Sequence, residues 1–114
     1  GLDMKRRAGF LYEHLAYRFK DKIAEPFLVT APYFEEEQEA PIHLSTHVGQ
    51  EFDYIISGNL KVAMEDHIEI LHAGDAIYYD SGRGHGMVAT GGKECVFLAV
   101  VMRDEEETEE PAHA

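Results

Sequence analysis

The stretch from Ser45 to Gly58 reads S-T-H-V-G-Q-E-F-D-Y-I-I-S-G. A Val-Gly-Gln turn separates His47 from Glu51, and an alternating strand follows as far as Gly58. Residues of the same parity share one face of a strand, and a short turn between two strands can bring two such faces together. We therefore expect His47 and Glu51 to converge on one point. An imidazole nitrogen and a carboxylate oxygen suit a first-row transition metal, provided that a third ligand completes the set.

Six of the seven histidines, all but His47, are available to supply that third ligand. His85 differs from the others because it follows Gly-Arg-Gly at the start of a predicted strand, where glycine permits close backbone packing around a site. His43 is on the same predicted strand as His47 but about 13 Å from it by strand rise, too far to reach the same ion. The remaining four histidines lie in the N-terminal segment, in the tail or beside a short strand. We expect His85 to point inward from the neighbouring sheet.

The composition describes one globular domain with an acidic surface. The chain has 114 residues, of which 45% are hydrophobic, enough for a single modest core. Its net charge of −12 is repelled by phosphate backbones and acidic membranes, so this chain by itself is not expected to bind nucleic acid. The single cysteine, Cys95, fits a reducing compartment. With no bilayer-length apolar stretch and no signal-peptide pattern, a cytoplasmic protein is expected.

Short apolar stretches with turn signals between them follow one another along the chain. The predicted strands are 9–19, 27–30, 42–48, 51–57, 60–64, 68–70, 76–79, 85–90 and 95–102. For 9–19 an amphipathic helical turn is the alternative, and the many aromatic residues favour the strand. Strands at this spacing, with no convincing long helix, indicate an antiparallel sandwich or barrel. We expect residues 1–8 to be a tag scar and linker, residues 9–103 to form the β-barrel domain, and residues 104–114 to be an acidic, disordered tail.

Two stretches resemble the paired motifs of the cupin family. H-V-G-Q-E-F-D-Y-I-I-S-G matches most of the first motif, G-x5-H-x-H-x3,4-E-x6-G, and residues 74–85 match much of the second, G-x5-P-x-G-x2-H-x3-N. The resemblance covers residues 42 to about 102. It implies an all-β fold, a small antiparallel jelly-roll barrel, with a metal or ligand pocket between two sheets. It also implies metal-ligand roles for His47, Glu51 and His85.

The sequence departs from the cupin pattern at three positions. Ser45, Asp80 and Ala89 stand where the family has its first histidine, its proline and its final asparagine. A serine hydroxyl is a poor ligand for a divalent metal, so the set of four shrinks to two histidines and one carboxylate. Two interpretations follow. The three residues form a facial triad with open positions for Fe, Mn, Ni or Zn, or they hydrogen-bond one another or an organic ligand in a metal-free pocket.

Further residues are expected around a ligand pocket, namely Ser45, Asp53, Tyr54, Ile55 and Tyr79. Asp53 shares parity with Glu51, and it either serves the pocket or lies at a solvated barrel mouth, since a buried carboxylate needs a partner. The tyrosine hydroxyls either reach the ligand or belong to ordinary sheet packing.

A second resemblance concerns function. The stretch A-Y-R-F-K-D-K-I-A-E-P-F-L-V-T, residues 16–30, together with the E-F-D-Y-I-I-S-G strand, resembles the C-terminal sensor half of bacterial regulators that join an N-terminal helix-turn-helix domain to a cupin. It implies a small-molecule ligand that changes how an attached DNA-binding domain sits on its operator. No helix-turn-helix is found within these 114 residues, so DNA would be reached only through a segment outside them.

Two other functions stay open. The same triad could serve a small metalloenzyme, either a non-heme iron oxygenase, an epoxidase-like enzyme or an isomerase. Alternatively, the barrel is a scaffold whose main role is dimerisation through its apolar sheet faces. We expect a homodimer.

Overall fold

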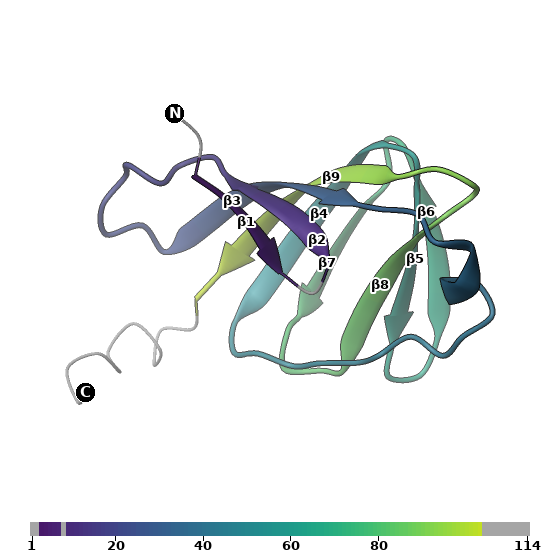
Figure 1. Ribbon diagram of the computed structural model, residues 1–114. Helices are drawn as coiled ribbons and strands as arrows, with labels where there is room; N and C mark the ends of the chain where they lie inside the picture. Colours follow the sequence, from purple (N-terminus) through teal and green to yellow (C-terminus); the bar gives the residue numbers. More distant parts are fainter. Residues whose placement is uncertain (1–2, 8, 104–114) are drawn as a thin grey trace.

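The computed structural model describes residues 3–7 and 9–103 (Figure 1). These residues form nine strands and one short 3-10 turn, η1 (Glu35–Glu37). The strands are β1 (Asp3–Arg7), β2 (Phe10–His14), β3 (Ala24–Ala31), β4 (Gln50–Ser57), β5 (Asn59–Met64), β6 (Ile68–His72), β7 (Ala76–Asp80), β8 (His85–Thr90) and β9 (Cys95–Met102). Among them there is no helix of the length and apolarity needed to cross a membrane.

The strands make two antiparallel sheets. The larger sheet has the order β1-β2-β3-β9-β4-β7, and the smaller has the order β6-β5-β8. Figure 1 shows β5, β6 and β8 gathered at one end, and the N-terminal strands β1 and β2 extend the larger sheet beyond β3. This is the all-β, antiparallel jelly-roll barrel that the sequence predicted.

Strand alternation builds the core between the sheets. On β9, Cys95, Phe97 and Ala99 are buried, while the residues between them are half-buried on the outer face. β3 and β4 show the same alternation next to β9. The buried residues that pack together as the hydrophobic core are Val29, Ala31, Ile55, Leu60, Val62, Leu71, Ala89, Cys95, Phe97 and Ala99.

The N-terminal segment corrects one expectation. Residues 3–7, predicted as linker, form β1 and pair with β2 in a register that sets Lys5 opposite Tyr12. The sequence D-M-K-R-R has little of the apolar alternation typical of a strand. β1 lies at the edge of the larger sheet, and charged residues are common in edge strands because they prevent pairing with another chain. The positions of the expected tag scar, at the extreme N-terminus, and of the expected acidic tail, at residues 104–114, lie outside the described residues.

Two other strand expectations are also wrong. Residues 42–48 form no ladder, and only Ser45 makes an isolated bridge, to His85. The stretch 27–30, which Pro26 was expected to open and Pro32 to limit to an edge or an end, is part of the interior strand β3 between β2 and β9. Pro26 lies within β3; it has no N–H to donate, but its carbonyl accepts a 3.0 Å hydrogen bond from the Leu15 amide.

Candidate metal centre

Three different elements place the side chains of the triad. Glu51 occupies the second position of β4, which alternation turns inward, and it is 8% exposed. His85 opens β8 and is 7% exposed. His47 lies in the irregular segment 42–49 that precedes β4 and is more exposed than the other two.

Backbone hydrogen bonds fix the segment that carries His47. Ser45 and His85 exchange two of them, with N···O distances of 2.8 and 3.0 Å. The His47 amide donates to the Ser81 carbonyl at 2.9 Å, and the Ser81 amide donates to the Gly49 carbonyl at 2.9 Å. The segment is thus tied to the start of β8 and to the turn after β7, although it belongs to neither sheet.

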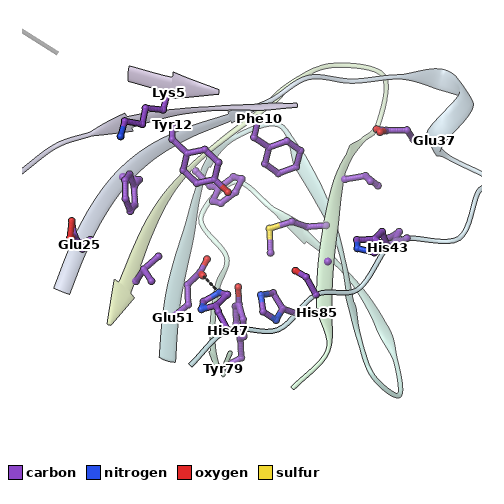
Figure 2. Close-up of a pocket in the computed structure, with 18 of the residues that line it drawn as sticks. Lys5, Phe10, Tyr12, Glu25, Glu37, His43, His47, Glu51, Tyr79 and His85 are labelled. Carbon is purple, nitrogen blue, oxygen red and sulfur yellow. Dashed lines mark ion pairs between the residues drawn. The ribbon is translucent and has the colours of Figure 1, made fainter. Parts of the chain in front are cut away.

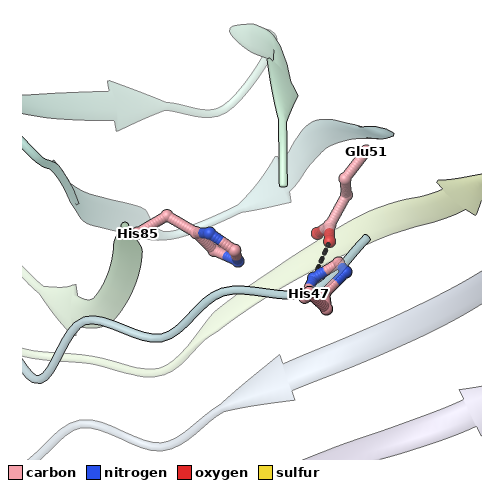
Figure 3. Close-up of side chains that lie close together, drawn as sticks. All are labelled: His47, Glu51 and His85. Atoms are coloured by element: carbon pink, nitrogen blue, oxygen red, sulfur yellow. Dashed lines mark ion pairs between the residues drawn. The ribbon is translucent and has the colours of Figure 1, made fainter. Parts of the chain in front are cut away.

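The three side chains converge (Figure 3). Each offers one ligand atom, and all three atoms lie within 4.8 Å of one another. His47 Nε2 is 3.7 Å from Glu51 Oε1, and the rings of His47 and His85 meet edge to face with centroids 5.1 Å apart. Ligand atoms around one first-row ion lie about 3–3.5 Å apart, given bond lengths near 2.1 Å. The triad is close to the spacing that a single ion requires.

The hydrogen bonds of the two imidazoles favour metal binding. His85 Nδ1 lies 2.9 Å from the Arg83 carbonyl oxygen, and His47 Nδ1 makes a longer contact of 3.4 Å to the Val48 carbonyl. A carbonyl can only accept, so the proton of His85 resides on Nδ1 and its Nε2 presents a lone pair. Metal-binding histidines are typically oriented in this way by their other ring nitrogen. The residues present therefore fit a divalent metal.

Two protonated groups lie beside Glu51 in the barrel. Asp53 is fully buried, and burial, reinforced by the Glu51 carboxylate, raises the pKa of Asp53 to about 10. Tyr79 pairs with Glu51 across β4 and β7, is 7% exposed, and has its pKa raised by burial and then by the nearby carboxylates. Among the described residues, neither carboxyl oxygen of Asp53 has a hydrogen-bond partner, and the Tyr79 hydroxyl has none either. The barrel-mouth interpretation of Asp53 is therefore wrong.

The other predicted pocket residues divide between cavity, core and surface. Ser45 and Tyr79 line the cavity, Ser45 without joining the triad. Tyr54 faces outward and is 41% exposed because its parity is opposite to that of Glu51. Ile55 faces inward but lies in the core opposite Phe97, away from the cavity lining. Tyr54 and Ile55 are thus placed elsewhere than the sequence suggested.

A cavity of about 1010 Å³ opens above the triad (Figure 2). Its far wall comes from strands that the sequence did not connect with the site, through Lys5, Phe10, Tyr12, His14 and Phe27. The shared parity of Phe10, Tyr12 and His14 is visible in the sequence. What the sequence lacks is the pairing of β2 with β3, which brings this face over the pocket.

Comparison with known proteins identifies the family. A family model described as Cupin domain matches residues 33–101, more than half of the chain. The chain belongs to the cupin family. The match includes all three residues of the triad and confirms the resemblance seen in the paired motifs.

Solved structures show the same fold in proteins of different function. Hydroxypropylphosphonic acid epoxidase from S. wedmorenis is 16% identical with a TM-score of 0.73, covering 89% of this cupin and 55% of that chain. An HTH_3 family transcriptional regulator from Vibrio cholerae is 21% identical with a TM-score of 0.64, and the match covers 84% of this cupin and 52% of the regulator. A Cupin 2 conserved barrel domain protein from Salinispora arenicola CNS-205 is 17% identical with a TM-score of 0.69, and the match covers 97% of this cupin and 89% of that protein.

The first two similarities are partial. This cupin spans about half the length of the epoxidase and of the regulator. Further similar structures include HppE with Fe(II), and HppE with Co(II) and substrate. No curated protein matches the sequence. At these identities the similarities establish the fold.

Proposed function

We propose that this cupin binds a divalent transition metal through His47, Glu51 and His85 and uses the adjoining cavity to sense a small molecule. The observation that carries the proposal is the convergence of three ligand atoms, within 4.8 Å of one another, beside a cavity of about 1010 Å³. When bound, the metal supplies a positive charge with open positions for ligand oxygens. Iron leads among Fe, Mn, Ni and Zn because two histidines and one carboxylate are typical of non-heme iron sites.

The lining of the cavity favours sensing over proton-transfer catalysis. An isomerase needs a base within reach of the substrate. Asp53 is fully buried and does not line the cavity, and the Tyr79 hydroxyl, which belongs to a lining residue, has its pKa raised by burial. The likeness to the Vibrio cholerae regulator supports the sensor role. We propose that the readout is a DNA-binding segment outside this chain, acting in the cytoplasm.

The second candidate is a small metalloenzyme. The observation that favours it is the number of ligands, because three protein ligands leave several positions open on the metal. An iron oxygenase or epoxidase-like enzyme can use such positions without a protein base, so the argument against an isomerase does not extend to it.

Oxygen uptake separates the two candidates. Protein reconstituted with Fe(II) is mixed with a ligand that it binds, and dissolved oxygen is followed with an electrode. The sensor proposal predicts saturable binding with no oxygen consumption above the buffer and free-iron controls. Oxygen uptake stoichiometric with product would establish the enzyme instead. In parallel, a gene reading frame that runs upstream of residue 1 and encodes two short helices around a turn would support the regulator.

We further propose that a second copy of this chain covers the outer face of the larger sheet. Its exposed apolar side chains include Tyr54 and Ile56 on β4, at 41% and 49% exposure. The outward positions of its three central strands carry no charge, namely Ala24, Pro26, Leu28, Thr30, Gln50, Phe52, Tyr54, Ile56, Val96, Leu98, Val100 and Met102. In a chain with a net charge of −12, copies can approach where charge is absent.

A further inference from the structure

We infer that the ligand is a ring-bearing carboxylic acid, with its carboxylate at the triad and its ring against an aromatic wall formed by Phe10, Tyr12 and Phe27. The inference rests on the proposed function, since it takes the metal-loaded triad as the polar end of the site. It is carried by the composition of the walls, the size of the cavity and the distribution of charge around it.

The aromatic wall faces the triad across the cavity. Figure 2 shows Phe10 and Tyr12 reaching into the cavity from β2, on the side opposite His47, Glu51 and His85. The rings of Tyr12 and Phe27 meet edge to face with centroids 5.5 Å apart, which holds both in place. All three rings are only half-buried by the protein. Their remaining surface suits a flat apolar group, because aromatic rings bind one another edge to face or offset.

The rest of the lining is mostly apolar. The lining includes Pro41, Ile42 and Met87, and it includes Val101, which pairs with Glu51 across β9 and β4. Cavities of roughly 300–1,000 Å³ accommodate drug-sized ligands. The volume of about 1010 Å³ therefore has room for one or more rings in addition to a polar head.

The charges of the lining favour an acid over an amine. A divalent ion bound with Glu51 leaves the triad end with a net positive charge. Glu25, a second acidic lining residue, is in contact with His14 at 2.6 Å and forms an ion pair with Lys22 at 3.7 Å.

At the mouth of the cavity, Lys5 is the single lysine or arginine of the lining. It lies opposite Tyr12 across β1 and β2, and Figure 2 shows the two side chains close together. The third acidic lining residue, Glu37, is half-buried, and Figure 2 shows it on the far side of the cavity from Lys5 and away from Glu51. A carboxylate therefore gains most at the triad.

A series of simple probes tests the inference. Protein loaded with Co(II), with loading followed by visible absorption, is titrated calorimetrically with acetate, phenylacetate and 2-naphthylacetate. Each ring buries about 100 Å² of apolar surface, which predicts at least a tenfold gain in affinity from acetate to phenylacetate and a further gain to 2-naphthylacetate. Equal affinities for acetate and 2-naphthylacetate would overturn the inference. So would 2-naphthylmethylamine binding as tightly as 2-naphthylacetate.

Wall variants assign the preference to its residues. Phe10→Ala and Tyr12→Ala should each lose at least fivefold in affinity for 2-naphthylacetate while keeping the affinity for acetate. Phe10→Leu keeps an apolar side chain and covers the case in which the alanine variant does not fold. Leu11→Ala is the matched control, because Leu11 lies between them on the opposite face of β2. A loss as large in Leu11→Ala contradicts the assignment.

The outcomes separate this inference from the function on which it rests. Absence of Co(II) binding overturns the metal-centre proposal and the inference together. Stoichiometric Co(II) binding without preference for ring-bearing acids overturns the inference alone and leaves the metal centre standing.

Discussion

His85 owes its orientation to the backbone rather than to an acidic side chain. The Arg83 carbonyl accepts from His85 Nδ1 at 2.9 Å, so the tautomer of His85 is set by the turn that precedes β8. The sequence could predict that His85 follows a glycine-rich turn at the start of a strand. It could not predict the hydrogen bond, which depends on how residues 83–85 curve in space.

Burial also governs the chemistry of Cys95. The side chain lies in the core, and its burial raises the pKa of the thiol to about 11. The folded form therefore holds the thiol proton at pH values where the unfolded chain begins to release it. This contribution to stability is fully present below about pH 9, the unfolded value, and is lost as the pH rises through about 11.

We expect Cys95 to resist alkylation. At pH 8.5, iodoacetamide should modify the folded protein at least 100-fold more slowly than the urea-unfolded protein, because the reactive thiolate is both scarce and covered. Mass spectrometry over time measures the two rates. Rapid labelling of Cys95 in the folded protein would show that this part of the core opens readily.

The irregular segment 42–49 is the element on which the site depends most. It has no sheet partner, yet it carries Ser45 and His47 and is held by bonds to His85 and Ser81. Gly86 lies directly against it. A Cβ atom at Gly86 would clash with the His43 carbonyl oxygen and lie 2.8 Å from Ile42 Cγ2.

Gly86→Ala should therefore disturb the metal centre without touching a ligand. We expect a loss of about 1–3 kcal/mol in the free energy of unfolding, typical of overpacking against backbone, and weaker metal binding because His47 shifts. Urea unfolding and metal titration measure the two effects. Gly82→Ala is the control, because its Cβ would meet only a side-chain oxygen of Asp80 at 3.2 Å. Unchanged metal affinity in Gly86→Ala would mean that the segment does not position His47.

Alternation predicted the regular elements well and the irregular ones poorly. β8 and β9 begin and end as expected, and β4 begins one residue early. The segment 42–49 alternates like a strand but forms no ladder, and its backbone hydrogen bonds go to His85 at the start of β8 and to Ser81 in the turn after β7. These partners lie 32 to 40 positions away along the chain, which no local pattern reports.

At the scale of the whole molecule, the three central strands of the larger sheet, β3, β9 and β4, have an uncharged outer face, and the protein has a strongly negative charge. We predict a dimer in solution, with a mass of twice 12.9 kDa by light scattering. Ile56→Glu places a charge on this face and should give monomers. Ile70→Glu is a matched control, because Ile56 and Ile70 are both 49% exposed but lie on different sheets. A monomeric wild-type protein, or dissociation by Ile70→Glu alone, would contradict the proposed interface.

The sequence predicted the global architecture better than it predicted the cavity. The paired motifs were enough to predict the barrel and the three residues that converge as the triad. The far wall of the cavity was missed because β1 and β2 lie outside the motifs. Their place over the site follows from the pairing of β2 with β3, which sequence parity cannot show.

Metal content tests the central claim most directly. Wild-type protein, His85→Ala and His67→Ala are each reconstituted with Fe(II) under anaerobic conditions, freed of excess metal and analysed by mass spectrometry. His67 is the control because it lies exposed on the surface among acidic side chains. We predict about one iron per chain in the wild type and in His67→Ala, and at least a tenfold loss in His85→Ala. Equal iron in wild type and His85→Ala would contradict the triad.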